Sequence, residues 1–467
     1  MNPMIRNFVA GEFCAARSEK SRSKVNPATL ESLGDAPDSN AVDMVFAIQA
    51  AHKALMTYSS TSVSERVALL TKMASALETR AQDFARTAAL EAGMPIAFSQ
   101  EFDIAPAIAT FRDCAERVAR LDGSNVGPAV SIQQPVGVCG LISSWSQPLL
   151  TMATQLAPCL AMGNTAVVKP SEQASLTAHL LAETLSEVPA GVVNIIHGGR
   201  EPALTLTQHP GVPLIAFTGS TETGVLVQTA AAAQVKRVSL ELGGKNAFVV
   251  LKDADLKKAA GAAAQAAFAA AGQSCLSTSR LYVQQDVYEP FMTEFRARVR
   301  ELTVGNPLDG ATIVGPLVSA EQLDRVNAAL AQALKEGGKA TVGGEGATGQ
   351  GYFFAPTIIE DLDHCSELWA SETLGPIVLV QSFKYPHDGV KWANTSTYGL
   401  AASLWTADPT RAQKLARDLN VGTVWVNSWG VRNPAAPYGG VRRSGQGRLG
   451  GDRGLEFFSE QKTIYGA

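Results

Sequence analysis

The sequence predicts an α/β protein, and three observations support this fold class. A chain of 467 residues is too long for one ordinary hydrophobic core, so two or three domains are expected. The composition, with 46% hydrophobic and 18% charged residues, is typical of a folded globular protein. From residue 135 onward, short apolar runs alternate with segments of helical periodicity. This alternation indicates parallel sheets with crossover helices.

The N-terminal segment predicts amphipathic helices after a turn-rich start. Asn26-Pro27 and Gly34 mark turns within residues 25–34. Apolar residues then recur at helical spacing in residues 41–58, 63–93 and 107–123. Gly93, which is followed by Pro95, marks the expected end of the second helix.

A doubly wound layer of the kind that binds nucleotides is predicted over residues 135–245. Residues 129–145 predict a hairpin-like strand followed by a buried strand. The helices expected next are 149–162, 174–187 and 222–233, and the expected strands are 165–169, 191–196, 213–217 and 236–241. Strands separated by helices favour one parallel sheet with helices packed against it.

A second α/β region follows this layer. Its expected strands are 246–251, 280–285, 376–383, 402–407 and 422–428, and its expected helices are 255–271, 286–302, 319–336 and 409–419. The alanine-rich stretch 259–272 contains Gln265 and predicts a buried helix rather than a membrane span. The segment after Gly451 ends in a β-like run, which is suited to pairing with the edge of a neighbouring subunit.

Charge and cysteine usage argue against several classes of function. The net charge of -4 gives no indication of a nucleic-acid partner. The six cysteines are scattered singly and the six histidines form no metal-binding motif, so no metal site is expected. Scattered cysteines favour a reducing compartment, and the first residues lack the apolar region of a signal peptide. We therefore expect a cytoplasmic protein without a membrane partner.

Lys169 and Glu172 form the first candidate site. Lys169 ends a buried strand and Glu172 lies in the turn after it, at the end where an α/β sheet places its ligands. The two are suited to holding the ribose hydroxyls of a nucleotide. The alternative is an ordinary strand-to-helix turn that is capped by Ser171.

Gly219, Ser220 and Gly224 form the second candidate site, between a predicted strand and a predicted helix. Glycine lets the backbone approach a ligand, and the N–H groups of a helix N-terminus bind phosphate. The segment matches neither of the common glycine-rich fingerprints, so a simple strand-to-helix turn is the alternative.

Glu241 and Cys275 are the candidates for chemistry. Glu241 lies between apolar runs, where a carboxylate needs either a partner or a function. It is interpreted as a general base, with an ion pair to a nearby basic residue such as Lys245 as the alternative. Cys275 is either a nucleophile or a small buried residue, because no charged residue that would stabilise a thiolate lies beside it in the sequence.

Ordered motifs along nearly the whole chain give a resemblance to a known family. They are NPAT (26–29), VVKPSE (167–172), FTGST (217–221), ELGGKN (241–246), GQSC (272–275), SETLGPI (371–377), VWVN (424–427) and PYGG-x-R-x-SG-x-GR (437–448). The chain resembles the NAD(P)-dependent aldehyde dehydrogenase superfamily. The resemblance favours Cys275 as the nucleophile.

The resemblance implies a mechanism and a set of roles. Cys275 attacks the aldehyde, hydride leaves to the nicotinamide, and Glu241 activates the water that hydrolyses the thioester. The cofactor residues that the resemblance implies are Trp145, Lys169, Glu172, Gly219, Ser220, Gly224, Leu242 and Glu372. Because the Glu172 carboxylate repels a 2'-phosphate, NAD is favoured over NADP.

The resemblance also implies the domain organisation. An NAD-binding domain of Rossmann type is expected at 1–119 and 137–245, and an α/β catalytic domain at 246–446. A small β element at 120–136 and 447–467 is expected to build a homodimer or a homotetramer.

Ser146 departs from the family pattern. The family usually has an asparagine after the tryptophan, and its amide donates to the oxyanion that forms during attack. Serine is shorter, and losing one such donor costs a factor of about 10²–10³ in rate. Milder departures are Leu374, where a phenylalanine is common, and Leu449, where a glutamate is usual.

Three residues near the expected substrate tunnel suggest a polar substrate. Gln147 and Arg432 stand where many relatives have aromatic residues, and Ser274 lies beside the nucleophile. Arg432 is suited to pairing with a carboxylate, as in a semialdehyde acid. The alternative is that Arg432 points to solvent on a loop.

Two other functions remain open at this level. In the first, CoA takes the acyl group instead of water, which the presence of Glu241 disfavours. In the second, the chain keeps the fold and binds ligands but catalyses slowly or not at all, because Ser146 occupies the position of the oxyanion donor. The main expectation is NAD-dependent oxidation of an aldehyde to a carboxylic acid.

Overall fold

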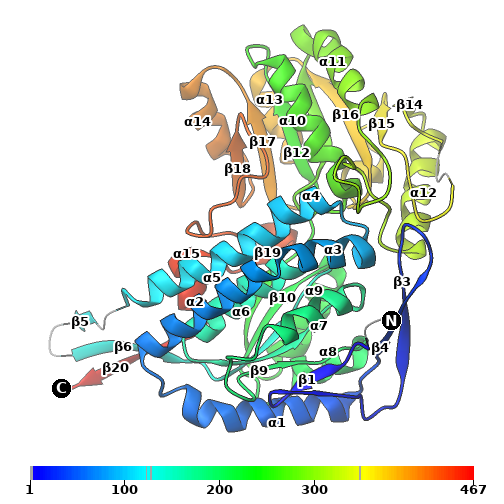
Figure 1. Cartoon of the computed structure of the whole chain (residues 1–467). Coiled ribbons are helices and arrows are strands. Elements are labelled where there is room, and N and C mark those ends of the chain that lie inside the picture. The colour runs from blue at the N-terminus through cyan, green and yellow to red at the C-terminus, as the bar shows by residue number, and fades with distance from the viewer. Residues whose placement is uncertain (1–3, 122–123, 127–128, 346–348, 467) are drawn as a thin grey trace.

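A computed structural model describes residues 4–121, 124–126, 129–345 and 349–466 of the chain. Two large sheets lie one above the other, each with helices packed against it, and a small sheet projects from the lower one (Figure 1). The α/β fold class predicted from the sequence is confirmed.

The first sheet has eight strands in the order β19-β11-β10-β7-β8-β9-β1-β2. Its five central strands are parallel. In chain order the strands are β1 Asn7–Val9, β2 Glu12–Cys14, β7 Val138–Ile142, β8 Thr165–Lys169, β9 Val193–Ile195, β10 Leu214–Thr218, β11 Arg237–Glu241 and β19 Gly445–Gln446. Successive strands are added on one side of β7 as far as β9 and then on its other side from β10, so the strand order reverses between β7 and β10. Open α/β sheets bind their ligands at such a point.

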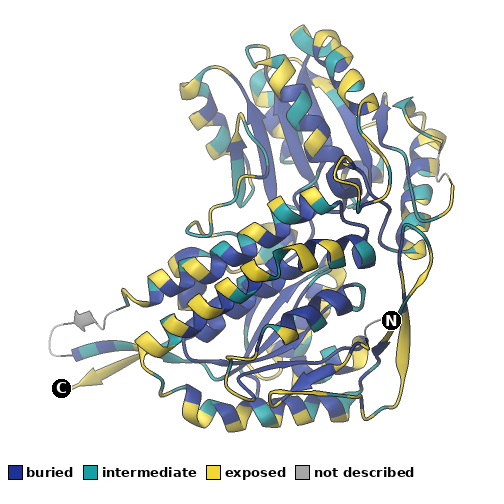
Figure 2. Cartoon of the chain, viewed as in Figure 1, coloured by how far each residue is buried: buried dark blue, intermediate teal, exposed yellow. Residues whose placement is uncertain are grey.

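Helices cover both faces of the first sheet. They are α1 Ala41–Tyr58, α2 Val63–Thr79, α3 Ala81–Ala92, α4 Ile96–Ser99, α5 Ala105–Val118, α6 Pro148–Ala161, α7 Ser175–Glu183, α8 Arg200–Gln208 and α9 Thr221–Ala232. Successive side chains of β10 point to opposite faces. Leu214 and Ala216 pack with the layer that contains α2, α5, α6 and α7, whereas Ile215 and Phe217 pack with α1, α8 and α9. The strands are therefore buried on both sides, as Figure 2 shows.

The second sheet has the order β14-β15-β16-β13-β12-β17-β18, and only β14 is antiparallel to its neighbour. Its strands are β12 Asn246–Val250, β13 Thr278–Gln284, β14 Lys339–Val342, β15 Thr357–Glu360, β16 Ile377–Phe383, β17 Ala401–Trp405 and β18 Thr423–Val426. Its helices are α10 Leu256–Phe268, α11 Tyr288–Arg300, α12 Ala320–Lys335, α13 Pro386–Ala393 and α14 Pro409–Asp418.

The small sheet joins distant parts of the chain. Strand β20 Ser459–Tyr465 pairs antiparallel with β6 Ala129–Pro135, which also pairs with β5 Ser124–Val126. Helix α15 Gly451–Phe457 leads into β20. The C-terminal run was expected to pair with a neighbouring subunit, but here its partner strand is β6 of the same chain. A hairpin of β3 Ser21–Val25 and β4 Ser32–Pro37 completes the strands.

Several predicted boundaries were wrong. The helix expected at 63–93 is two helices, because Arg80 leaves the helical conformation between α2 and α3. The helix expected at 255–271 ends at Phe268, since Ala270 and Ala271 adopt positive φ angles of 50° and 57°. The helix expected at 107–123 ends at Val118, and residues 122–123 lie outside the described part of the chain. Periodicity did not predict several elements that are short or partly exposed, namely β1 to β4, α4, α8, α13, α15, β14, β15 and β19.

Within the described part of the chain, no helix is both long enough and apolar enough to cross a membrane.

Candidate active site

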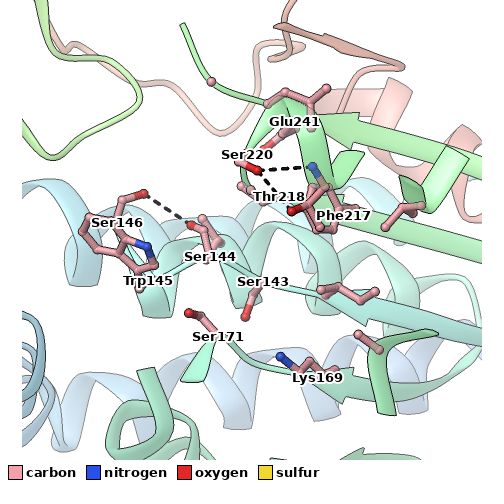
Figure 3. Close-up of a pocket in the computed structure, with 18 of the residues that line it drawn as sticks. Ser143, Ser144, Trp145, Ser146, Lys169, Ser171, Phe217, Thr218, Ser220 and Glu241 are labelled. Carbon is pink, nitrogen blue, oxygen red and sulfur yellow. Dashed lines mark hydrogen bonds between the residues drawn. The ribbon is translucent and has the colours of Figure 1, made fainter. Parts of the chain in front are cut away.

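A cavity of about 1070 Å³ lies at the carboxyl ends of β7, β8, β10 and β11. The ends of these four strands and the loops after them line one part of it, with residues 143–147, 169, 171–173, 218–220 and 241–243. The second α/β region lines the other part with Cys275, residues 318–319 and 321–322, Glu372, Leu374 and Arg432, among others. Figure 3 shows the strand-end residues gathered around this space. The cavity therefore occupies the position where a doubly wound sheet binds its ligand.

Lys169 and Glu172 contact each other at the end of β8. The Lys169 ammonium lies 3.2 Å from the Glu172 carboxylate and is almost fully buried, whereas Glu172 remains partly exposed. Burial lowers the pKa of Lys169, and the charge of Glu172 acts in the opposite direction. The alternative that Ser171 caps the turn also holds, because its hydroxyl accepts from the backbone N–H of Gln173. The two interpretations are compatible.

Buried Lys24 of β3 braces this turn. Its ammonium donates to the backbone carbonyl of Glu172 at 2.7 Å and to the side-chain oxygen of Gln173 at 3.0 Å. These contacts fix the turn and leave the Glu172 carboxylate at the cavity.

Gly219, Ser220 and Gly224 have different environments. Gly219 and Ser220 line the cavity, and the Ser220 hydroxyl accepts from the N–H of Thr223 as the N-cap of α9 (Figure 3). A Cβ at Gly224 would lie 2.4 Å from a methyl carbon of Leu242. Gly224 therefore permits close packing of α9 on the segment after β11, and it is not among the residues that line the cavity.

Glu241 ends β11 and faces the cavity (Figure 3). Only 8% of the residue is exposed, and its Oε1 atom is buried without a hydrogen-bond partner among the described residues. Burial raises the pKa of Glu241 to about 7, while the charges of Arg432 and Arg448 act to lower it. The alternative ion pair with Lys245 is wrong, since no such pair forms within the described ranges.

Cys275 lies in a tight turn that follows a stretch of left-handed backbone. Gly272 has a φ of +64°, and a Cβ there would lie 2.5 Å from the carbonyl oxygen of Gly375, so glycine is required. The Asn246 side chain donates to the carbonyls of Cys275 and Ser277 at 2.7 and 3.0 Å, which fixes the turn at the start of β12. The Cys275 side chain is partly buried and reaches the same cavity as Glu241.

The groups around Cys275 shift the pKa of its thiol in opposite directions. Burial raises the pKa of the thiol to about 11, and the negative charges of Glu241 and Glu372 raise it further. Arg432 and Tyr438 act to lower it. The thiolate therefore depends on the last two side chains and on whatever else enters the cavity.

Glu372 approaches from the second α/β region. One of its oxygens accepts the backbone N–H of Gly244 at 3.0 Å, and burial raises its pKa to about 7. Leu374 has a φ of +50° and lines the cavity, and the Gln322 side chain holds it by donating to the carbonyls of Thr373 and Leu374.

Trp145, Ser146 and Gln147 form the loop after β7, and Trp145 and Ser146 appear together in Figure 3. The Ser146 hydroxyl lies 3.3 Å from the hydroxyl of Ser144. Gln147 lines the cavity, but it is 2% exposed and its amide donates to the carbonyl of Phe102 at 2.6 Å. Gln147 therefore anchors the loop as well as contributing to the wall.

The interpretation of Arg432 as a solvent-facing residue is wrong. Arg432 lines the cavity with Cys275 and Glu241, and its guanidinium carbon lies 4.1 Å from the centre of the Tyr438 ring. Its Nε atom is buried without a hydrogen-bond partner among the described residues. Long charged residues on loops are usually exposed, so the inward position could not be expected from local sequence.

Ser274 does not fit its expected position. It is 3% exposed and is not among the residues that line the cavity. Its hydroxyl accepts from the backbone N–H of Leu276, so it stabilises the turn around Cys275 instead of facing a substrate.

Two further residues at the site were missed as individual candidates. Tyr438 belongs to the PYGG motif, which assigns it no role, although it lines the cavity beside Arg432. Leu204 lies in none of the motifs, although it is exposed within the cavity wall. Nothing in the local sequence distinguishes either residue from ordinary surface or core positions. No cluster of three or more metal-ligating side chains occurs among the residues described here.

Comparison with known proteins agrees with this geometry. A model of the aldehyde dehydrogenase family matches residues 13–464. The chain is 37% identical to 2-hydroxymuconic semialdehyde dehydrogenase from Pseudomonas sp. strain CF600, over 98% of this chain and 99% of that protein. It is 36% identical to human 2-aminomuconic semialdehyde dehydrogenase, over 99% and 98% of the two chains.

A solved structure of an aldehyde dehydrogenase from Bacillus cereus in complex with NAD⁺ superposes with a TM-score of 0.97. Its sequence is 33% identical, and the match covers 99% of this chain and 96% of the other. The match of the family model, the near-complete coverage and the shared fold lead to one conclusion. The chain belongs to the aldehyde dehydrogenase family.

Proposed function

We propose that this aldehyde dehydrogenase oxidises an aldehyde to the carboxylic acid with NAD, using Cys275 as nucleophile and Glu241 as general base. The observation that carries the proposal is that Cys275 and Glu241 line one cavity together with Lys169 and Glu172. A thiol, a carboxylate whose pKa is raised to about 7 by burial, and a strand-end ligand site are the parts that this reaction needs.

The cavity has residues suited to both the adenosine half and the nicotinamide half of NAD. Leu204 of α8 and Leu226 of α9 are large apolar side chains exposed in its wall, and they suit the faces of a flat ring. Lys169 and Glu172 would hold the adjoining ribose, and the start of α9 at Ser220 would face the diphosphate. Trp145, Leu242 and Glu372 would hold the nicotinamide half. When bound, NAD supplies the hydride acceptor.

The preference for NAD over NADP rests on Glu172. Its partly exposed carboxylate at the cavity accepts hydrogen bonds from a free 2'-hydroxyl and repels a 2'-phosphate. The Bacillus cereus relative was solved in complex with NAD⁺, which agrees with NAD as the cofactor.

The residues of the chain perform the chemistry as follows. The Cys275 thiolate adds to the aldehyde carbon and forms a thiohemiacetal, whose oxygen is stabilised by hydrogen-bond donors. The backbone N–H of Cys275 and the hydroxyl of Ser146 are the proposed donors. Oxidation leaves a thioester on Cys275, and Glu241 takes a proton from the water that hydrolyses it. The unpartnered Oε1 of Glu241 is free to accept that proton.

We also propose that the substrate carries a carboxylate, which Arg432 recognises. The buried and unpartnered Nε of Arg432 supports this, because a guanidinium fork pairs with a carboxylate through two hydrogen bonds. The relative from Pseudomonas is named for 2-hydroxymuconic semialdehyde, which agrees with an acidic semialdehyde.

A screen of NADH absorbance tests the function. Semialdehyde acids and matching uncharged aldehydes are compared with NAD or NADP, each with and without CoA. Oxidation that needs CoA would support acyl transfer instead, and NAD binding without oxidation of any aldehyde would support an inactive binding protein. For Arg432→Ala and Arg432→Lys, a larger loss of kcat/KM on the acid than on the uncharged aldehyde is expected. Equal losses would remove the carboxylate proposal.

We further propose a division of labour among the three largest sheets and an oligomer built by the three-stranded one. The first sheet would bind the cofactor, the second would carry the nucleophile, and strands β5, β6 and β20 would join copies of the chain. Ile464 and Tyr465 of β20 are exposed apolar residues, which supports a contact there. The six free cysteines support a reducing compartment, for which the cytoplasm is proposed.

A further inference from the structure

Tyr438 is held rigidly beside the proposed nucleophile. Its backbone N–H donates to the carbonyl of Leu449 at 2.6 Å, and its carbonyl accepts the N–H of Leu449 at 2.9 Å. Its ring lies against the Arg432 guanidinium, 4.1 Å from the guanidinium carbon. The backbone and the ring are therefore both fixed, which leaves little freedom to the hydroxyl at the end of the ring.

The hydroxyl of Tyr438 is buried and has no hydrogen-bond partner among the described residues. Leaving a buried hydroxyl unpaired costs free energy, so such a group asks for an explanation. Tyr438 and Cys275 both pack against the buried cluster of Leu276, Leu400, Ala401 and Trp425, and both line the cavity. The unpaired hydroxyl thus lies in the space where the sulfur of Cys275 reacts.

We propose that Tyr438 is a further catalytic residue, whose phenolic O–H donates a hydrogen bond to the thiolate of Cys275. The inference rests on the proposed function, because it takes Cys275 as the nucleophile. No bond of the phenol breaks in this step. The thiol gives its proton to water or buffer in the open cavity, and the phenol stabilises the negative sulfur that remains.

The charges around Cys275 explain why such a donor is needed. Glu241 and Glu372 both raise the pKa of the thiol, as does burial. Arg432 and the hydrogen-bonding influence of Tyr438 act in the opposite direction. The pKa of Tyr438 itself is held well above its usual value by burial and by the nearby thiolate. A raised pKa favours the protonated phenol, which is the form that can donate a hydrogen bond to the thiolate.

Tyr438→Phe tests the inference, because it removes the hydroxyl and keeps the ring that Arg432 covers. Alkylation of Cys275 by iodoacetamide is followed against pH in the cofactor-free enzyme, with the modified peptide quantified by mass spectrometry. The midpoint of the profile is expected to move upward, and the rate at a fixed pH below it to fall about tenfold, the factor for one pKa unit. Exposed Cys365 in the same molecule is the internal control and keeps its rate.

Tyr58→Phe controls for the loss of a buried phenol elsewhere, since the Tyr58 hydroxyl donates to the carbonyl of Leu160 at 3.1 Å, away from the cavity. Its Cys275 profile is expected to match the wild type. If Tyr438→Phe does not fold, a fluorinated tyrosine at 438 serves instead. A more acidic phenol is a stronger donor and should move the midpoint downward.

An alkylation profile that is unchanged in Tyr438→Phe, or by the fluorinated residue, would overturn the inference. The measurement needs neither aldehyde nor NAD, so it separates the two proposals. A wild-type enzyme that oxidises no aldehyde, but whose Cys275 profile responds to Tyr438, would contradict the proposed function alone.

Discussion

Ser146 is the residue whose chemistry most limits the proposed reaction. Its hydroxyl is short, and it already lies 3.3 Å from the hydroxyl of Ser144. Any donation to an oxyanion therefore competes with this neighbour. The longer amide of asparagine reaches further into the cavity and offers two donors.

We expect Ser146→Asn to raise kcat for aldehyde oxidation by about tenfold, a part of what one oxyanion donor contributes. The measurement is NADH formation at saturating aldehyde and NAD. Ser144→Ala is the matched control, since it frees the Ser146 hydroxyl without lengthening the side chain. A rate that stays the same or falls in Ser146→Asn would mean that serine is adapted to this site.

Glu241 affects Cys275 through its charge as well as through water activation. Its pKa is about 7, so the carboxylate is charged above that pH and then raises the pKa of the thiol. We expect Glu241→Gln to lower aldehyde oxidation by about 10²-fold or more, because the general base is lost. Alkylation of Cys275 above pH 7 should nevertheless become faster than in the wild type.

The two readouts are compared on one preparation, with NADH formation for the reaction and peptide mass spectrometry for alkylation. Below the pKa of Glu241 the carboxyl is neutral in the wild type, so the alkylation rates of variant and wild type should converge there. Slower alkylation in Glu241→Gln at high pH would contradict the charge argument.

At the scale of elements, a π-helical segment at Gln100–Ile104 anchors the loop that carries Ser146. Its Phe102 carbonyl accepts from the Gln147 amide at 2.6 Å. The buried Asp103 carboxylate accepts the N–H groups of Leu149 and Leu150 at 3.4 and 2.7 Å. This π-helical turn thus supplies the acceptor for the N-terminal N–H groups of α6 and also fixes the loop before α6. Irregular helical turns of this kind are frequent at functional sites.

Asp103→Ala should lower the free energy of unfolding by about 2 kcal/mol, because two buried N–H groups lose their acceptor. It should also lower kcat, since the Ser146 loop loses its anchor. Asp103→Asn is the matched control, because its amide oxygen still accepts from Leu150. Urea unfolding and NADH formation check both effects. An alanine variant as stable as the asparagine variant would show that the cap contributes little.

The central strands were predictable because their apolar runs are buried on both faces. The elements that were missed carry weaker signals. Helix α8 buries only Pro202, Leu206 and Thr207, and β14 is a short edge strand without a fully buried residue. Hydrophobic periodicity also cannot locate the C-terminal end of an alanine-rich helix. The left-handed turn after Phe268 depends on contacts with distant segments, such as the N–H of Ala270 donating to the carbonyl of Ile313.

At the scale of the whole molecule, the site is assembled from residues of two sheets. The sequence pattern predicts the positions of the site residues on the first sheet better than those on the second. Lys169, Ser220 and Glu241 lie at the carboxyl ends of strands of one predicted parallel sheet, or just after them, so their convergence at one edge could be expected. The position of Cys275 opposite them was implied only by the family resemblance, since nothing local links the second sheet to the first. The inward Arg432 and the unpaired Tyr438 hydroxyl depend on loop packing, which single-sequence patterns do not encode.

The small sheet carries the last prediction, which concerns assembly. Strand β20 pairs with β6 along its whole length, from Ser459 with Pro135 to Tyr465 with Ala129, and projects from the body of the molecule (Figure 1). Its Ile464 and Tyr465 are 40% and 76% exposed. An edge strand that exposes apolar side chains at its end offers a contact to another chain unless it is covered.

Truncation after Phe458 should therefore convert a dimer or tetramer into a monomer, as measured by size-exclusion chromatography with light scattering. The cut also removes acceptors of Arg237, whose guanidinium donates to the Ser459 carbonyl and the Glu460 carboxylate, so some stability is lost with it. Ile464→Lys separates the two effects. It keeps the strand and those contacts but places a charge in the exposed apolar patch, and it should dissociate the oligomer without lowering the midpoint of thermal unfolding by as much. Lys462→Ala, on the same strand, should leave the mass unchanged. A truncated chain with the mass of the full-length oligomer would exclude this sheet as the contact.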